Sequence, residues 1–506
     1  VAELIEAIEK PVKAGFMKEN PWKNFKVGVY TDENYDPKNI DLHRPYVDDI
    51  ILVSDKGEPM KRESDLIDVW FDSGAMPFAQ MHYPFENKEV VDNGEFYPAD
   101  FIAEGVDQTR GWFFTLHAIS TMIKDSVAFK AVISNGLVLD KNGNKMSKRL
   151  GNAVDPFETI EKYGSDPLRW YMITNASPWD NLKFDVEGVE EVRRIFFGTL
   201  YNTYSFFALY ANVDSFTNSQ PQVPMANRPE IDRWIISLLN SLIKEVDESY
   251  NDYEPTRAGR AISNFVNDHL SNWYVRLNRK RFWGGTLTED KLAAYQTLYT
   301  CLDTICRLMA PISPFYADRL FLDLNSATGC DGSESVHLSD FPKADESLID
   351  KVLEERMQLA QDISSMTLSL RKKENIKVRQ PLQQIMVPVL SEREKENIDA
   401  VKDLIMNEVN VKGINFVDDS AGILVKKIKP DFKKLGPKCG KSMKMVAAQL
   451  QELSQEEISN FEKSGVYTLN IDGNDITIEK GDVEILSEDI PGWLVANNGV
   501  ITIALD

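Results

Sequence analysis

Positive charge gathers on one short segment of this chain, which has the sequence DKNGNKMSKRLG at positions 140–151. It follows an apolar run, AVISNGLVL (131–139), and the pair Asn142-Gly143 permits a tight turn. Two ammonium groups three residues apart, those of Lys145 and Lys148, can face one polyanion. They are most useful where charge develops on a departing pyrophosphate, because they stabilise that charge directly. A solvated basic turn is the plain alternative.

A second candidate site precedes this loop, in the segment FIAEGVDQTRGWFF (101–114). Glu104 is a carboxylate at the end of an expected strand and suits an ammonium group, while Gly105 allows a ligand to approach the backbone. Asp107 can accept hydrogen bonds from ribose hydroxyls, and Gln108 can add another. The same residues are also typical of an acidic helix N-terminus, which leaves both interpretations open.

A third segment, DHLSNWYVRLNRKRFW (268–283), places cations beside aromatic residues. This combination binds single-stranded nucleic acids, because cations attract phosphates and aromatic rings stack on bases. The alternative is a helix with an aromatic core face and a basic C-terminal turn that complements the helix dipole. The candidate binding residues are Arg276, Arg279, Lys280 and Arg281, next to Trp273, Tyr274, Phe282 and Trp283.

Lysines are concentrated again in residues 426–444, which hold eight lysines and one aspartate. The whole chain has 506 residues and a formal net charge of −22, so this contrast is strong. Lys433 and Lys434 are candidates for contacts with nucleic-acid phosphates, and a merely solvated face is the alternative. The acidic total argues against indiscriminate binding to nucleic acids or membranes.

The four cysteines form no C-x-x-C pair, and no histidine lies at finger-like spacing. We therefore expect no protein-bound zinc or other metal, and free thiols in a reducing cytoplasm. No run of eighteen apolar residues occurs, and the segment IFFGTLYNTYSFFALYANV, from residue 195, predicts a buried helix rather than a membrane span. The amphipathic, acidic start VAELIEAIEK is unlike a signal peptide, so we expect a cytoplasmic protein.

The pattern of apolar residues divides the chain into regions. Residues 1–65 are polar and mixed, and they predict no convincing core of their own. Residues 66–185 alternate apolar runs with helical patterns, which favours a parallel α/β sheet. The runs DLIDVWF, ADFIAEG and KAVISNGLVL are the expected strands there, and Asp155-Pro156 and Asp166-Pro167 each predict a helix start. Helical periodicity over 186–345 predicts a helix bundle, and 346–506 indicate a small α+β domain.

The sequence resembles the class I aminoacyl-tRNA synthetases, and among them the isoleucine-specific members, on segments that follow the family's order. KMSKR (145–149) is similar to the family's mobile KMSKS loop, with Arg149 where serine is more usual. Residues 101–114 resemble an adenylate-binding segment. DLIDVWFDSG (65–74) is closer to the isoleucine members than to the valine members, which more often have TWFSS. Residues 268–283 resemble the anticodon-binding helices, and 426–444 a C-terminal extension of the eukaryote-like isoleucine enzymes, which some bacteria share.

This resemblance implies an architecture and a reaction. The fold would be a Rossmann-type α/β catalytic portion, an all-α anticodon-binding bundle and a small α+β C-terminal domain. The implied parts are a connective remnant (1–65), the second half of the catalytic domain (66–185), the stem-contact region with the bundle (186–345), and a truncated extension (346–506). The reaction would activate isoleucine with ATP and Mg²⁺ to the adenylate and transfer it to tRNA(Ile), in a monomer.

The resemblance also assigns residues to roles. Lys145 and Lys148 would stabilise the transition-state phosphates, and Trp70 and Trp112 would form walls of the pocket for the amino-acid side chain. Glu104 would hold the amine of isoleucine. The residues implied to bind ATP or the adenylate are Glu104, Gly105, Asp107, Gln108, Gly136 and Ser147. Those implied to bind tRNA are Arg276, Arg279, Lys280, Arg281, Lys433 and Lys434.

Two departures and two alternatives accompany this resemblance. The family's HIGH motif is absent, because the five histidines are isolated, and no segment resembles an editing domain. Both ends indicate a piece of a longer chain, so we expect negligible ATP–pyrophosphate exchange from the piece alone. A valine- or leucine-specific synthetase is one alternative. The other is a non-catalytic tRNA-binding module that uses only the bundle and residues 426–444.

Overall fold

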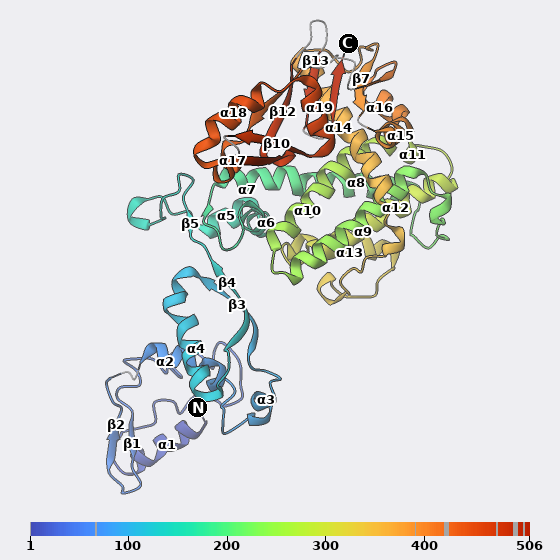
Figure 1. Ribbon diagram of the computed structural model, residues 1–506. Helices are drawn as coiled ribbons and strands as arrows, with labels where there is room; N and C mark the ends of the chain where they lie inside the picture. The colour runs from blue at the N-terminus through green and yellow to red at the C-terminus, as the bar shows by residue number, and fades with distance from the viewer. Residues whose placement is uncertain are drawn as a thin grey trace. The chain divides into compact units, whose positions relative to one another are not determined.

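The computed structural model describes residues 2–65, 68–389, 391–418, 425–471, 474–488, 494–498 and 501–505. The chain forms two compact units, Val1–Leu137 and Val138–Asp506 (Figure 1). This division falls inside the region 66–185 that we expected to form one catalytic half. The KMSKR segment therefore belongs to the same unit as the helix bundle, and residues 101–114 belong to the other.

The first part of the N-terminal unit has a small core, which the sequence analysis did not predict. Ile8, Trp22, Phe25, Ile40 and Ile50 are buried against one another, although no periodic pattern connects them in the sequence. The elements around them are α1 (Ala2–Lys13), β1 (Ile51–Val53) and β2 (Pro59–Lys61), and the two strands are antiparallel.

The rest of this unit is a parallel strand pair with helices. β3 (Ala99–Gly105) pairs in parallel with β4 (Phe129–Asn135), as the alternating pattern predicted. Its helices are α2 (Val69–Ala79), α3 (Lys88–Asp92) and α4 (Trp112–Lys124), with a 3-10 helix η1 (Val106–Arg110) after β3. The expected strand DLIDVWF is wrong, because Asp68 caps a helix there: its Oδ1 accepts a hydrogen bond of 2.8 Å from the backbone N–H of Trp70. Residues 66 and 67 of that run lie outside the described residues.

Helices α2 and α4 cross at a glycine. A Cβ placed on Gly74 would lie 2.9 Å from the Cδ1 of Ile119 and from the backbone carbon of Thr115. The two helices enclose a small hydrophobic core with the nearby strands, which includes Phe78 and Leu116. Gly74 therefore permits the close packing that holds α2 on α4.

The C-terminal unit begins with a short strand pair and two capped helices. β5 (Val138–Leu139) pairs in parallel with β6 (Leu182–Lys183). α5 (Pro156–Tyr163) begins after Asp155, whose Oδ1 accepts hydrogen bonds from two backbone N–H groups, and it ends at Gly164 with φ of 92°. The predicted start of α5 is thus confirmed.

Asp166 has a different role from the predicted one. Helix α6 (Ser165–Asn175) starts one residue earlier, and Asp166 lies buried in its first turn. The Oδ2 of Asp166 accepts a hydrogen bond of 2.6 Å from the backbone N–H of Tyr316, in the first turn of α13 (Pro314–Thr328). Burial raises the pKa of Asp166, and this hydrogen bond offsets part of the effect. Asp166 thus caps a helix that is distant in the sequence.

Helices dominate residues 186–345, as their periodicity predicted, and a further long helix follows at 351–373. The helix α9 (Glu230–Asn251) has an apolar stripe at helical spacing, and its members Trp234, Ile235, Leu239 and Val246 are all buried in the main core. Two segments have π-helical hydrogen bonding, Arg193–Phe197 and Phe265–Val275. The helices are α7 (Val186–Val192), α8 (Gly198–Val213), α9 (Glu230–Asn251), α10 (Pro255–Asn264), α11 (Arg276–Phe282), α12 (Glu289–Met309), α13 (Pro314–Thr328) and α14 (Lys351–Lys373).

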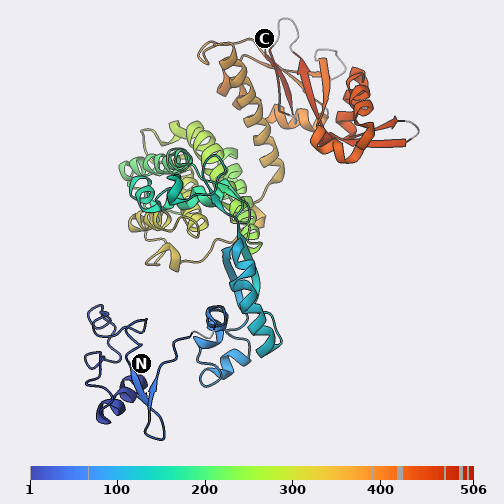
Figure 2. The same cartoon turned by 90° about the vertical axis from the view of Figure 1, so that its left-hand side faces the viewer.

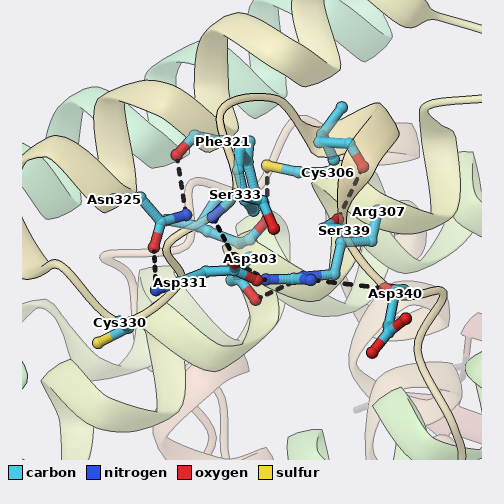
Figure 3. Close-up of polar contacts among 12 residues, drawn as sticks. Asp303, Cys306, Arg307, Phe321, Asn325, Cys330, Asp331, Ser333, Ser339 and Asp340 are labelled. Carbon is cyan, nitrogen blue, oxygen red and sulfur yellow. Dashed lines mark hydrogen bonds and ion pairs between the residues drawn. The ribbon is translucent and has the colours of Figure 1, made fainter.

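A polar cluster fixes the loop between α13 and α14. Figure 3 shows Arg307 between Asp303 and Asp331, at 3.0 and 2.8 Å from their carboxylates. The hydrogen bonds from Ser333 and the nearby Arg307 lower the pKa of Asp331 to about 2. The backbone N–H of Asp331 also donates to the Oδ1 of Asn325, at 3.0 Å. These contacts attach the loop to α12 and α13.

The C-terminal part is α+β, as predicted. A four-stranded sheet has the order β13-β14-β7-β8, in which only β7 and β8 are parallel. Helix α14 connects this part to the bundle (Figure 2) and contributes to the same core. Its strands are β7 (Ile385–Val389), β8 (Ile414–Asp418), β9 (Val425–Pro430), β10 (Val466–Ile471), β11 (Asn474–Glu479), β12 (Val483–Glu488), β13 (Leu494–Asn497) and β14 (Thr502–Leu505). Its helices are α15 (Glu392–Ala400), α16 (Lys402–Val409), α17 (Phe432–Cys439), α18 (Met443–Gln451) and α19 (Gln455–Ser464).

The predicted helix near residue 195 lies in the bundle, where Phe196, Phe197 and Leu200 are buried. Within the described ranges, no helix is both long enough and apolar enough to cross a membrane. The four cysteines are free thiols, and of these only Cys330 is exposed.

Replacing Gly74 with alanine should loosen the contact between α2 and α4. The added Cβ meets the backbone of α4, which cannot move as a flexible side chain can, so we expect a loss of about 1–3 kcal/mol. Native-state hydrogen exchange at the amides of α2 and α4 measures this locally. Gly436→Ala is the control, because its Cβ would meet nothing within 4 Å. Equal protection in Gly74→Ala and the unmodified chain would contradict the expectation.

Candidate functional site

The KMSKR segment is a turn built around Asp140. The Oδ1 of Asp140 accepts hydrogen bonds from the backbone N–H groups of Asn142 and Asn144, at 3.0 and 2.8 Å. Its Oδ2 accepts from the side-chain amide of Asn152 at 3.0 Å. Gly143 has φ of 86°, as the predicted Asn-Gly turn requires. The hydrogen bond from Asn152, followed by that from the Asn144 backbone, lowers the pKa of Asp140.

Asn152 closes the other side of this turn. Its Oδ1 accepts a hydrogen bond of 2.9 Å from the backbone N–H of Ser147, and its amide also donates to the carbonyl of Lys145 at 3.3 Å. The hydroxyl of Ser147 in turn accepts from the backbone N–H of Leu150, at 3.2 Å. The hydroxyl of Ser147 thus supports its own loop in this structure.

One side chain anchors the turn while its cations lie outside. Met146 packs against a cluster that includes Tyr171 and Leu182. Lys145 and Arg149 are exposed, and neither forms an ion pair with any residue that the structure describes. The side chain of Lys148 is not among those that the structure describes. A rigid turn that presents uncompensated cations suits an anionic ligand.

The second candidate group follows strand β3. Glu104 and Asp107 are exposed at the end of β3 and in η1, and Gly105 ends the strand opposite Asn135 of β4. A Cβ on Gly105 would lie 2.5 Å from the Oδ1 of Asp107, so the glycine leaves room for that carboxylate. Gln108 uses its Oε1 to accept from the backbone N–H of Trp112 at 2.9 Å, which caps α4. Its role is therefore at least partly structural.

The two tryptophans expected to line a pocket belong to α2 and α4. The indole Nε1–H of Trp112 donates to the carbonyl of Ser73 at 3.1 Å, and this bond fixes the ring. Trp70 is 46% exposed, with its ring edge 3.1 Å from where a Cβ on Gly111 would lie. Gly136, the further ATP candidate, follows directly after β4. An apolar ligand pocket on these residues stays a prediction.

Arg281 is held inside the bundle. Its Nη1 and Nη2 lie 2.6 and 2.9 Å from the two carboxylate oxygens of Asp232, which is fully buried. Its remaining donors bond Asp290 and Asn278. Burial lowers the pKa of the Arg281 guanidinium, but the pairing with Asp232 outweighs it and the pKa is raised. All five N–H donors of Arg281 are thus occupied. Its presence is therefore explained by contacts within the bundle, without a contact to nucleic acid.

The other cations of this segment are all exposed, but they differ in their partners. Arg276 forms an ion pair with Glu408 of α16, while Arg279 and Lys280 are exposed. The expectation of four stacking aromatics needs correction, because Trp273, Tyr274 and Phe282 are buried in the core. Only Trp283 remains exposed, at 53%. Trp273 and Tyr274 lie in the π-helical segment and Phe282 at the end of α11, and all three rings face the core.

The lysine-rich segment is less positive in space than in sequence. Lys429 lies 3.6 Å from Glu484, and Lys438 forms ion pairs with Glu479 and Asp482. Lys434 donates to the carbonyl of Gly481 at 2.9 Å. Acidic groups from distant strands therefore neutralise part of the charge.

Lys433 and Lys434 border a cavity of about 800 Å³. Its lining is mixed, because it also contains Asp431, Glu462 and Glu484 beside the lysines. Among the residues with described side chains, no group of three or more His, Cys, Asp or Glu could hold a metal ion.

Three positioning residues escaped the sequence analysis, namely Asp140, Asn152 and Asp232. The first two flank the KMSKR segment, and an Asx pattern at a turn is the signal that could have found them. Asp232 had no such signal, because its partners lie on other helices.

The turn around Asp140 should lose order in acid. Because the pKa of Asp140 is lowered in the folded turn, its stabilising effect is complete above about pH 4 and disappears as pH falls through the lowered value. Amide hydrogen exchange at Asn142 and Asn144, corrected for intrinsic rates, should accelerate over that range. In Asp140→Asn this acceleration should be absent; an equal acceleration in the variant would disprove the assignment to Asp140.

Removing Arg281 should destabilise the bundle strongly. Arg281→Met leaves the carboxylate of Asp232 buried without its cation, with the hydroxyl of Tyr274 still donating to it at 2.8 Å, and breaking such a pair costs about 3–5 kcal/mol. Urea unfolding followed by far-UV circular dichroism measures this loss. The exposed neighbour gives the control, since Arg279→Met should change the free energy of unfolding by less than about 0.5 kcal/mol. Similar stabilities of the two variants would contradict this role of Arg281.

Two family models match the chain. Residues 18–185 match the model "tRNA synthetases class I (I, L, M and V)", and residues 232–386 match "Anticodon-binding domain of tRNA ligase". The first match spans both candidate groups near residues 104 and 145. The second contains α11 and reaches residue 386, beyond the boundary that we expected at 345.

Curated relatives align along the whole chain. The isoleucine–tRNA ligase of Bacteroides thetaiotaomicron is 73% identical over 508 residues, which cover 100% of this chain and 44% of that protein. That of Porphyromonas gingivalis is 67% identical with the same coverage. That of Clostridium acetobutylicum is 43% identical over 93% of this chain and 45% of its own length. The chain thus spans less than half the length of these relatives, and it belongs to the class I tRNA synthetases.

Proposed function

We propose that this chain is part of an isoleucine–tRNA ligase. The observation that carries the proposal is the identity of 73% and 67% to two such ligases over the entire chain. The valine- and leucine-specific alternatives find no comparable support, because these relatives are isoleucine ligases.

The proposed reaction has two steps. The carboxylate of isoleucine attacks the α-phosphate of ATP, bound as its magnesium complex, and forms isoleucyl-adenylate with release of pyrophosphate. The terminal ribose of tRNA(Ile) then takes the acyl group and AMP leaves. Neither step needs a nucleophilic side chain, so the residues contribute binding, orientation and charge stabilisation.

Lys145 and Lys148 are the residues that we assign to the phosphates. The exposed ammonium of Lys145 on a turn fixed by Asp140 and Asn152 supports this role, because a preorganised cation needs little rearrangement as charge develops. Ser147, which supports the turn, is a weaker candidate for an ATP contact.

Glu104 would bind the ammonium group of isoleucine, and Asp107 with Gln108 the ribose of the nucleotide. The exposure of both carboxylates next to Gly105 supports these assignments. Trp112 would form one wall of the side-chain pocket, with its indole fixed by Ser73, and Trp70 would form another. Gly136 would contribute backbone to the ATP site.

The tRNA face would use α11 and the lysine-rich segment. Arg279, Lys280 and Trp283 supply exposed cations and an exposed ring, which together suit single-stranded bases. Lys433 and Lys434 would add phosphate contacts. We further propose that the protein acts as a monomer in the cytoplasm.

A chimera tests this function. The aligned segment of the Bacteroides thetaiotaomicron ligase is replaced by this chain, and isoleucine-dependent ATP–pyrophosphate exchange and tRNA binding are measured. The chimera should be active with isoleucine and prefer it to valine and leucine. Lys145→Ala/Lys148→Ala should lower exchange about 100-fold or more while tRNA binding persists.

Two outcomes separate the alternatives. Arg279→Ala/Lys280→Ala is the matched variant, since it removes two cations from the other site and should weaken tRNA binding while exchange persists. A chimera whose exchange is unaffected by loss of both Lys145 and Lys148 would contradict the catalytic assignment of these lysines. A chimera that binds tRNA but shows no exchange would favour a tRNA-binding module.

A further inference from the structure

An unassigned group of cations surrounds the end of α14. Four of them are exposed, and none forms an ion pair with any residue that the structure describes. Glu374 is the only acidic residue between positions 371 and 384. We call these four residues the neck cations: Lys372, Lys377, Arg379 and Lys412.

The backbone that carries the neck cations is fixed first by the end of α14. The N–H of Ile376 donates to the carbonyl of Arg371 at 2.8 Å, and that of Asn375 donates to Lys372 at 3.2 Å. Asn375 adopts the left-handed conformation, with φ of 57°. This pattern is a Schellman motif, which ends the helix in a defined geometry.

A buried guanidinium then fixes the loop that follows. Arg371 is 1% exposed, and it donates to the carbonyls of Lys377, Gln380 and Asn410 at 3.2, 2.9 and 2.9 Å. Carbonyl oxygens are its only hydrogen-bond partners among the described residues, and burial lowers its pKa. A buried cation without a carboxylate is costly, so its retention indicates that the shape of this loop matters.

The loop is connected to the cations of α11. Asn410, which accepts from Arg371, also donates from its side-chain amide to the carbonyl of Val378 at 2.8 Å. Two residues before it, Glu408 forms the ion pair with Arg276 of α11. This ion pair joins α11 to α16, and on α11 the residues Arg279 and Lys280 lie one helical turn after Arg276.

We propose that the neck cations and the exposed cations of α11, Arg279 and Lys280, form one surface that binds the phosphate backbone of a single RNA. This inference rests on the proposed function, because it takes tRNA as the partner. RNA is favoured over an acidic protein, since the exposed ring of Trp283, which directly follows α11, can stack on a base. Arg371 positions the loop and does not itself contact the RNA.

The salt dependence of binding tests this surface. Dissociation constants of the chain for transcribed tRNA(Ile) are measured across a series of salt concentrations. Lys377→Ala/Arg379→Ala should weaken binding, and the slope of log K against log salt should become less steep by about 1.5. Because both side chains are exposed, circular dichroism and thermal unfolding should match the unmodified chain.

A charge-matched control uses the opposite end of α9. The variant Lys244→Ala/Lys343→Ala also removes two exposed cations, and both lie beside the C-terminal half of α9. The pair of Asp232 and Arg281 lies at the start of α9, so the control is distant from α11. The control should keep the original slope. An unchanged slope in Lys377→Ala/Arg379→Ala, or an equal change in the control, would overturn the proposed surface.

The same series separates this inference from the proposed function. If Arg279→Ala/Lys280→Ala changes the slope and Lys377→Ala/Arg379→Ala does not, the neck cations are excluded while tRNA binding by α11 stands. If the unmodified chain binds no tRNA while the chimera performs isoleucine-dependent exchange, the proposed surface fails and the proposed ligase function stands. If the neck cations bind an acidic protein instead of RNA, Lys377→Ala/Arg379→Ala leaves the slope for tRNA unchanged, which is the first of these outcomes.

Discussion

The bidentate pair between Arg281 and Asp232 is the constraint on which the bundle's basic face depends. A buried carboxylate must be paired, and the planar guanidinium satisfies both of its oxygens at once. Since Arg281 also bonds Asp290, the pair joins the start of α9, the end of α11 and the start of α12. With Arg281 committed inward, α11 can present Arg279 and Lys280 only toward the solvent.

Much of the fold could be predicted where one local rule acts alone. The apolar stripe of α9, the Asp-Pro start of α5 and the parallel pairing of β3 with β4 are of this kind. The strand expected at residue 69 failed because a single capping aspartate outweighed the apolar run after it. The core around Trp22 was missed because its members are far apart in the sequence and follow no period.

The candidate site shows the same limit. The KMSKR cations were evident as a charge pattern, but the turn that holds them depends on the paired side chains of Asp140 and Asn152. For α11 a usable signal existed: Tyr274, Asn278 and Arg281 recur at helical spacing, which indicates one inward face. We expected all four cations of residues 268–283 to bind nucleic acid, although this spacing already separates Arg281 from the other three. The acidic residues that pair with the lysines of residues 426–444 from distant strands, such as Glu484 with Lys429, could not be predicted from the local sequence.

The π-helical segment Phe265–Val275 bears on how this part of the chain can change in evolution. Its hydrogen bonds span five residues instead of four, so it accommodates more chain per turn than the α-helix that follows. Each residue of an α-helix advances the side chains by about 100°. A single-codon loss within this segment can therefore be absorbed by a change to the tighter α-helix, which leaves α11 in register. A loss inside α11 itself would instead rotate the residues after it, with Phe282 turned toward water and the guanidinium of Arg281 away from its carboxylate. Among homologues, length variants of one residue should therefore occur in this stretch or in the connecting loops and be absent from α11.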